Sequence, residues 1–155
     1  MAQLSPVLPL IGGGHTRFQP VYVGDVARAL TYAVTRPEAA GQTLELGGPA
    51  VVSFRQLMEL MLREIDRRRI LAPIPFVAAE VLGGLGDLAS IVVAPPITAD
   101  QVALLRTDNV VSGAYPGLAE LGITPTTLEA VLPTYLYRYR KGGQYADQED
   151  RALAV

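Results

Sequence analysis

The stretch Thr16–Leu30 reads TRFQPVYVGDVARAL and combines the two signals that decide the fold. Its first half, Phe18–Val23, is rich in aromatic and β-branched residues and predicts a strand, with Pro20 typical of an edge or bulged position. Gly24-Asp25 then opens a predicted helix, in which Asp25 is the expected N-cap and apolar residues recur at helical spacing. A strand that leads directly into a helix indicates an α/β protein.

Elements of both kinds surround this stretch. Strands are predicted at Leu8–Ile11, Thr43–Leu46, Ile70–Ile74 and Asn109–Ser112, and helices at Phe76–Ser90, from Thr98 to Arg106, and after a cap at Thr124. The strongest helical pattern begins at Ser53, because Ser53 and Gln56 have the spacing of a capping box and apolar residues follow on one face. The sequence therefore predicts an α/β fold with short strands and about six helices. So little sheet indicates part of a larger fold, not a complete one.

Length, charge and composition limit the function. We expect one lobe at residues 1–140, followed by a polar, disordered tail at 141–155. Half of the residues are hydrophobic, which indicates either a well-filled core or a face that another protein or a second copy covers. The net charge of −2 argues against nucleic-acid binding. The chain has no cysteine, so it has no disulfide or thiolate site, and a reducing compartment fits best.

Two glycine motifs invite a nucleotide-binding interpretation. Gly12-Gly13-Gly14 precedes a predicted strand, whereas a phosphate cradle needs glycines that lead into a helix N-terminus, so we predict a plain turn. Gly84–Ala89 reads GLGDLA and matches G-x-G-x-x-A, the dinucleotide fingerprint. That fingerprint requires a buried strand before it and a long helix after it. Here a helical pattern precedes it and Pro95-Pro96 soon follows, so we predict no cofactor site there.

Three further patterns have ordinary interpretations. Tyr137 and Lys141 have the Tyr-x-x-x-Lys spacing of an acid–base pair, but they end the last predicted helix beside Gly-Gly and look like a basic helix terminus. His15 is the only histidine and cannot assemble a usual metal site alone. Arg67-Arg68-Arg69 closes a helix; the alternative is a patch for acidic lipid or an acidic partner, and hence peripheral membrane contact.

The run Thr16–Ala29, followed in order by TLELGGP at Thr43–Pro49 and SFRQL at Ser53–Leu57, resembles a signature of extended and atypical short-chain dehydrogenases/reductases. With its ending PTYLYRYR at Pro133–Arg140, the chain is most similar to the NAD(P)H-binding accessory subunit of respiratory complex I and its bacterial relatives. The resemblance covers about residues 3–145. It corresponds to the C-terminal half of that epimerase-like family.

The resemblance implies that the cofactor loop and the true Tyr-x-x-x-Lys helix lie in an N-terminal Rossmann half outside these residues. We therefore expect no catalytic residue, cofactor or metal in this chain, and NADP(H) or NAD(H) in the intact protein. A structural or assembly role follows, with complex I subunits as partners. His15, Arg17, Gln19 and Tyr22 are expected to face the ligand cleft, with Arg17 toward a phosphate or carboxylate. Arg17 departs from the family by lying one residue farther from the Val-x-Asp turn.

Two other functions stay open. The chain could be the substrate lobe of an NAD(P)-dependent epimerase or reductase that acts on a nucleotide-sugar or similar substrate. An intact catalytic Tyr and Lys in the missing half would favour that function. Alternatively, the chain is a self-associating interaction module that pairs through its apolar face. The expected location is the bacterial cytoplasm, and a position at the periphery of the inner membrane stays open as an alternative.

Overall fold

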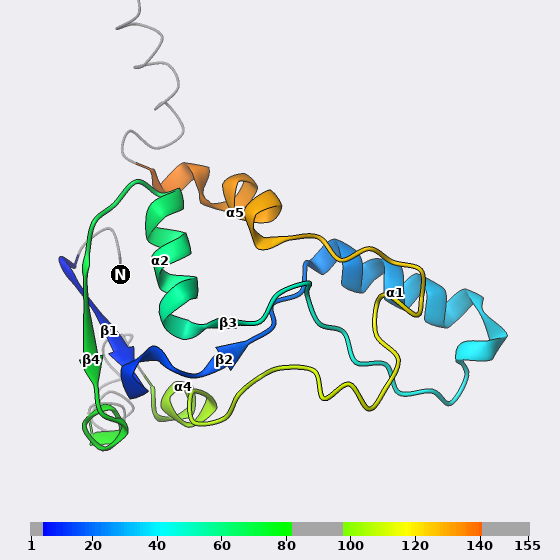
Figure 1. The fold of residues 1–155 in the computed structure, drawn as a ribbon, viewed down its shortest axis with the longest axis horizontal. Helices are drawn as coiled ribbons and strands as arrows, with labels where there is room; N and C mark the ends of the chain where they lie inside the picture. The colour runs from blue at the N-terminus through cyan, green and yellow to red at the C-terminus, as the bar shows by residue number, and fades with distance from the viewer. Residues whose placement is uncertain (1–4, 82–97, 141–155) are drawn as a thin grey trace, which may run out of the picture.

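The computed structural model describes residues 5–81 and 98–140, which form short strands and helices joined by long loops (Figure 1). The elements are β1 (Val7–Ile11), η1 (Gly12–Gly14), β2 (Arg17–Phe18), α1 (Val23–Thr35), η2 (Pro37–Ala39), β3 (Val52–Ser53), α2 (Phe54–Glu64), β4 (Ile70–Ile74), α4 (Ala99–Leu104), α5 (Leu128–Leu136) and η3 (Tyr137–Tyr139). Residues 76–81 are also helical. The predicted mixed α/β architecture is confirmed, and it is consistent with a partial Rossmann-type unit.

The longest strands, β1 and β4, pair in parallel, with Val7 opposite Ile70 and Ile11 opposite Ile74. Both had been predicted from the sequence. Helices lie on both faces of this pair, as parallel strands require. On one face α2 packs through Leu62 and Ile65 against Leu8 of β1. On the other, helix 76–81 and α4 pack against Ile11 of β1 through the residues Ala79 and Val102.

Two prolines limit how far this sheet can extend. Ile70 donates its backbone N–H to the Pro6 carbonyl at 3.1 Å. Because pairing groups alternate along a strand, the even-numbered residues of both strands direct their backbone into the ladder. Pro9 and Pro73 therefore lie at positions whose backbone faces away from the partner strand. Neither proline interrupts the ladder, but each leaves its outer edge without one backbone donor, which disfavours a third strand on either side.

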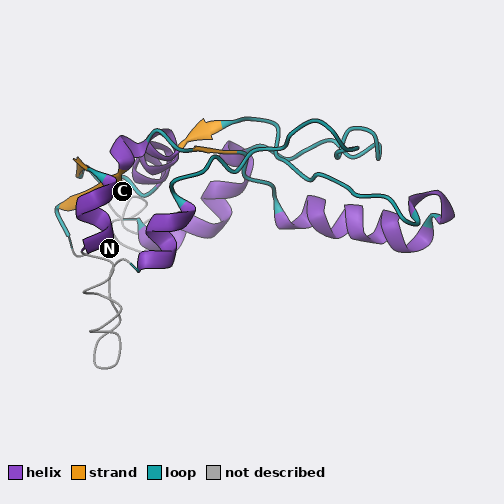
Figure 2. Cartoon of the chain, turned by 90° about the horizontal axis from the view of Figure 1, so that it is seen from below, coloured by secondary structure: helices purple, strands orange, loops and turns teal. Residues whose placement is uncertain are grey.

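The helix α1 lies at the end of the molecule opposite to β1, β4 and α2 (Figure 1). One face of α1 packs through Ala29 against Leu118 and Ile123, which belong to a loop. Figure 2 shows α1 accompanied, apart from the short η2 that follows it, by loops among the described elements. Within residues 5–81 and 98–140, the buried hydrophobic residues that cluster do so in three small groups, whereas a domain of this size usually has one contiguous core.

Three predicted strands are wrong or reduced. The strand at Phe18–Val23 shrinks to Arg17–Phe18, and Thr43–Leu46 is not a strand. Asn109–Ser112 contributes a single bridge from Asn109 to Phe18. These segments have strand-forming sequences, but a strand needs a neighbour to receive its backbone bonds, and among the described residues each finds only isolated partners. The missing ladders, not the local propensity, decide the outcome.

The helix starts were predicted with mixed success. The capping box predicted at Ser53 is confirmed, because Ser53 Oγ accepts from the Gln56 N–H at 3.2 Å. The helix predicted from Thr98 is capped in the same way, by Thr98 with Gln101, which have the same spacing in the sequence. Asp25 is not an N-cap, because α1 begins at Val23 and places Asp25 inside its first turn. Thr124 is not a cap either. Instead, α5 begins at Leu128 and is capped by the Thr127 hydroxyl, three residues later than the Thr-Pro pattern predicts.

Several predictions lie outside the described residues. These include the disordered tail at 141–155, and with it the domain boundary at residue 140, as well as the Gly84–Ala89 motif and the later part of the helix predicted at Phe76–Ser90. Within residues 5–81 and 98–140, no helix is long and apolar enough to cross a membrane.

Candidate functional site

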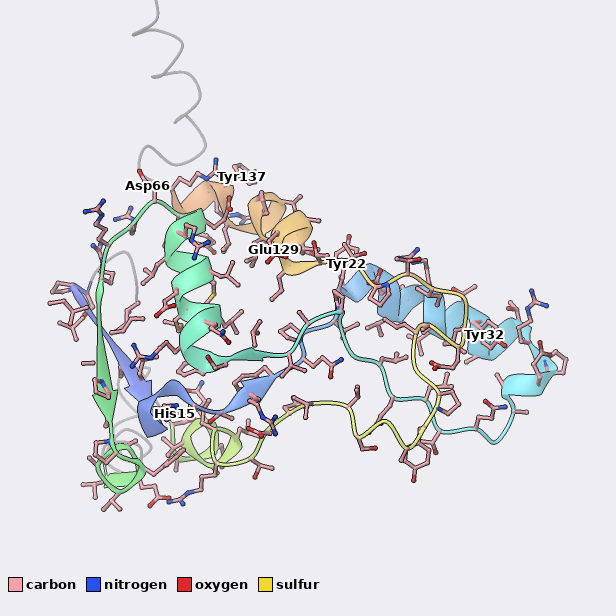
Figure 3. The ribbon with its side chains drawn as sticks, viewed as in Figure 1. His15, Tyr22, Tyr32, Asp66, Glu129 and Tyr137 are labelled. Carbon is pink, nitrogen blue, oxygen red and sulfur yellow. The ribbon has the colours of Figure 1, made fainter. Side chains whose placement is uncertain are left out.

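The four residues predicted to face a ligand lie along the segment that leads from β1 to α1. His15 is exposed just after η1, and Tyr22 is half-buried immediately before α1. Figure 3 shows these two side chains at separate places along this segment, with β2 between them. Arg17 and Gln19 lie between the two and take part in contacts with later segments. The four therefore do not gather around one hollow, and their predicted role in binding a ligand stays a prediction.

Arg17 pairs with a carboxylate of its own chain. Its backbone N–H and its Nε each donate to Asp108, at 2.8 Å in both cases, and Asn109 donates back to the Arg17 carbonyl at 2.8 Å. The backbone N–H and then the guanidinium of Arg17 lower the pKa of the Asp108 carboxyl. Arg17 itself is 61% exposed, and its hydrogen bonds within the described residues use only the backbone and Nε. The pair thus fastens β2 to the loop after α4.

Gln19 joins three segments. Its Nε2 donates to the Gly48 carbonyl at 2.8 Å, and its Oε1 accepts from the Val111 N–H at 3.2 Å. The backbone of Gln19 also donates to Asn109 at 3.0 Å. At Gly48 the chains approach so closely that a β-carbon would lie 1.8 Å from the Pro20 carbonyl oxygen. Gln19 therefore has its amide occupied by structural bonds, and only glycine fits opposite it.

Glu45 closes the same group of loops from the other side. Its Oε2 accepts from the backbone N–H and hydroxyl of Ser112, each at 2.9 Å, and from the Gly113 N–H at 3.1 Å. These bonds, with the Ser112 N–H first, hold the pKa of the Glu45 carboxyl below its ordinary value. The carboxylate is thus committed to a turn, as expected for an acceptor that binds successive backbone N–H groups.

Asp25 is the one fully buried charged side chain of the described residues, with no exposed surface. Its Oδ2 accepts from the Thr126 N–H at 2.6 Å, and its Oδ1 accepts from the Thr126 hydroxyl at 2.9 Å and from Arg28 at 2.5 Å. Burial acts to raise the pKa of Asp25, but the Thr126 and Arg28 donors together lower it below its ordinary value. Asp25 therefore locks the start of α1 to the segment that precedes α5.

Two shallow hollows lie beside these contacts. One of about 210 Å³ is lined by Gln19, Glu45, Asn109 and their neighbours. The other, of about 130 Å³, is lined by Pro20, the loop at Pro49–Ala50 and the start of α5. Ligand pockets of ordinary size measure ~300–1,000 Å³. Neither hollow is large enough by itself to enclose a nucleotide.

The described residues do not form a dinucleotide cradle. Gly12–Gly14 folds into the turn η1 and leads to β2, as predicted, and not into a helix whose N-terminus would receive a pyrophosphate. Within residues 5–81 and 98–140, no group of three His, Cys, Asp or Glu side chains could hold a metal ion. Of the Tyr137 and Lys141 pair, Tyr137 is exposed at the start of η3, and Lys141 lies outside the described residues.

The basic run after α2 is used in part within the chain. Arg67 donates through Nε to the Tyr139 carbonyl at 3.4 Å, and Arg140 pairs with Glu64 of α2. These bonds fasten the end of α5 and η3 beside α2. The lipid-binding interpretation of Arg67-Arg68-Arg69 remains untested.

Sequence reasoning missed the two partners that organise this region, Asp108 and Thr126. Both are about 90–100 residues from the side chains that they bind, since Arg17 to Asp108 spans 91 positions and Asp25 to Thr126 spans 101. No local spacing links them. The only available signals were weak: Asp108 adjoins a predicted strand, and Thr126 follows the expected cap at Thr124.

The fold and these contacts define a small α/β unit whose polar side chains mainly hold its own loops together. No protein-family model matches the chain. It is 37% identical to NADH dehydrogenase (ubiquinone) 1 alpha subcomplex subunit 9 of Arabidopsis thaliana over 143 residues, which cover 88% of this chain. The rat protein of the same name is 32% identical over 86% of the chain. The NADH-ubiquinone oxidoreductase 40 kDa subunit of Neurospora crassa is 28% identical over the same share.

The chain spans only about a third of these relatives, 36% of the Arabidopsis protein and 35% of the other two. It is thus homologous to one part of a subunit of NADH:ubiquinone oxidoreductase, which confirms the resemblance inferred from the Thr16–Ala29 signature. The expected location was wrong. All three relatives are named as mitochondrial proteins of eukaryotes, and these names point to mitochondria, not to a bacterial cytoplasm.

Proposed function

We propose that the chain is the C-terminal, substrate-side part of a protein of the complex I subunit type, with a structural or assembly role in mitochondria and no catalysis of its own. The observation that carries the proposal is the similarity itself, which extends over 88% of this chain but 36% of its Arabidopsis relative. A part of this kind contributes surface to a larger assembly.

The contacts of the predicted site support a structural role. Arg17 and Gln19, which resemble substrate-facing residues, are engaged by Asp108, Gly48 and Val111. The described hollows are small. A nicotinamide cofactor, NADP(H) or NAD(H), would be held by the rest of the intact protein, because the described residues lack a phosphate-binding turn before a helix.

The alternative is the substrate lobe of an NAD(P)-dependent epimerase or reductase. One observation favours it: Arg17 is 61% exposed and anchored through Nε, so its terminal nitrogens are available for a phosphate or carboxylate. Reductase or epimerase activity of the intact protein that Arg17→Gln abolishes would favour this alternative over the structural role.

Two measurements test the proposal. The tagged chain, expressed in mitochondria of its source organism, should comigrate with NADH dehydrogenase activity in a blue-native gel. The isolated chain should bind NADPH no more tightly than millimolar by calorimetric titration. Migration only as free chain, or submicromolar capture of NADPH by the isolated chain, would overturn the proposal. The mass of the native gene product decides whether the remaining part is on the same polypeptide.

A further inference from the structure

The helix α1 has a second apolar stripe, on the side away from its own packing. Val23, Ala27, Leu30 and Val34 follow each other at intervals of four, three and four residues, so they lie within about 60° of one another on a helix of 3.6 residues per turn. Val23 is 63%, Leu30 60% and Val34 87% exposed, and Ala27 is exposed as well. We call these four residues the α1 stripe.

The opposite side of α1 is already satisfied. Ala29 is buried against the loop residues Leu118 and Ile123, and Asp25 is locked to Thr126. In α/β folds a helix buries its apolar face against a sheet or another helix. Here the described elements beside α1 are mainly loops (Figures 1 and 2), and the exposure of Val23, Leu30 and Val34 shows that none of these elements covers the stripe. A packing layer is therefore missing over the stripe.

Charge does not protect the stripe from association. The positions beside it are Gly24, Val26, Thr31 and Ala33, all uncharged. Arg28 is the one ionic side chain on the exposed part of α1, and it pairs with Asp25. A neutral stripe with small flanking residues permits the close approach of another packed element.

The area that the α1 stripe can bury shows whether a second copy of this chain or a different polypeptide packs on it. A helix of 13 residues is about 20 Å long, so a seam about 10 Å wide between two copies of α1 would bury about 400 Å² in total. Stable interfaces bury ~1,200–2,000 Å², so pairing of α1 with α1 falls well short. The outer edges of β1 and β4, each of which lacks one backbone donor at a proline, are poor substitutes. A second copy of the chain is therefore disfavoured.

We propose that the α1 stripe docks the part of the relatives' length that this chain does not match, about two thirds of the Arabidopsis protein. This inference rests on the proposed function and adds which surface carries the contact. That complementary part is long enough to supply a whole sheet and its helices, and so a packing layer along all of α1. It packs on Leu30 and Val34 as one half of a domain packs on the other.

Photocrosslinking in mitochondria tests the contact. A benzoylphenylalanine replaces Leu30 in the full chain, and mass spectrometry identifies the crosslinked peptide. The matched control carries it at Thr35, which is exposed on the same helix about 110° from the centre of the stripe. The proposal expects a crosslink from position 30, at least tenfold stronger than from position 35, to a peptide similar to the unmatched part of the Arabidopsis relative.

A disrupting variant adds a second readout. Ala27→Lys with Val34→Lys, in the background that carries the probe at position 30, should reduce the crosslink at least tenfold, whereas Thr35→Lys should not. All three substituted side chains are exposed, so circular dichroism should stay unchanged. A crosslink to a second copy or to an unrelated protein, or none, would overturn the inference. If the chain still comigrates with NADH dehydrogenase activity, the proposed function survives that result.

Discussion

Replacing Asp25 by Asn tests whether the lock between α1 and the segment before α5 organises this half of the molecule. The carboxylate is fully buried and accepts three hydrogen bonds, two of them from Thr126, 101 residues away. Asn keeps the shape but turns one acceptor oxygen into a donor. Its amide nitrogen therefore faces either the Thr126 N–H or the Arg28 guanidinium with a donor of its own, and it loses the charge that Arg28 pairs with.

The contacts set the magnitude. Hydrogen bonds to a charged group contribute ~1.5–3 kcal/mol each. The ion pair adds less than about 1 kcal/mol, because Arg28 is 56% exposed. Asp25→Asn should therefore lower the free energy of unfolding by about 2 kcal/mol, since one charged hydrogen bond is lost. Arg28→Gln, the matched control, should lower it by less than about 1 kcal/mol.

Urea unfolding followed by circular dichroism measures both variants. The reasoning also predicts a pH dependence. Because the pKa of Asp25 in the folded chain lies below its ordinary value of 3.8, its stabilising contribution is complete above that value and is lost as the pH falls through the lower, folded pKa. The difference in the free energy of unfolding between the wild type and Asp25→Asn should therefore decrease in that acid range. The expected difference in the free energy of unfolding at pH 7 is about 2 kcal/mol, and a difference under about 0.5 kcal/mol would refute the role of Asp25 as a lock. An Arg28→Gln variant that is as unstable as Asp25→Asn would refute it too.

Three further predictions concern single contacts. Gly48→Ala should destabilise the chain by more than ~2 kcal/mol in urea unfolding, because the new β-carbon would overlap the Pro20 oxygen. The control Gly41→Ala has open space around it and should cost only the ~1 kcal/mol of its positive φ. Equal losses of stability in the two variants would contradict the close approach at Gly48. Ser53→Ala should cost ~1 kcal/mol by removing the cap of α2, and no change in thermal unfolding would count against the capping box. Arg17→Gln should cost under ~1 kcal/mol, because its pair with Asp108 is exposed, and a larger loss in the same assay would make that pair a structural centre.

Local chemistry predicted the elements whose signals are complete within a few residues. The boxes at Ser53 and Thr98 close between a side chain and a backbone three residues away, so their spacing predicted where α2 and α4 begin. The strands at Leu8–Ile11 and Ile70–Ile74 were also found, since each is a short apolar run ended by turn residues. The strand predicted at Thr43–Leu46 failed, because a strand also depends on a neighbour.

In the candidate site, too, the sequence predicted some features, and others depended on partners that are distant along the chain. The order of the motifs from Thr16 to Leu57 was enough to indicate the similarity to a complex I subunit, because a comparison of sequences needs no tertiary contacts. What Arg17, Gln19 and Asp25 do was decided only in three dimensions, where partners up to 101 positions away meet them. Spacing along the chain carries no information about such partners. Only the tertiary structure shows which apolar face of α1 is buried on loops and which is exposed, because both faces carry the same types of apolar residue.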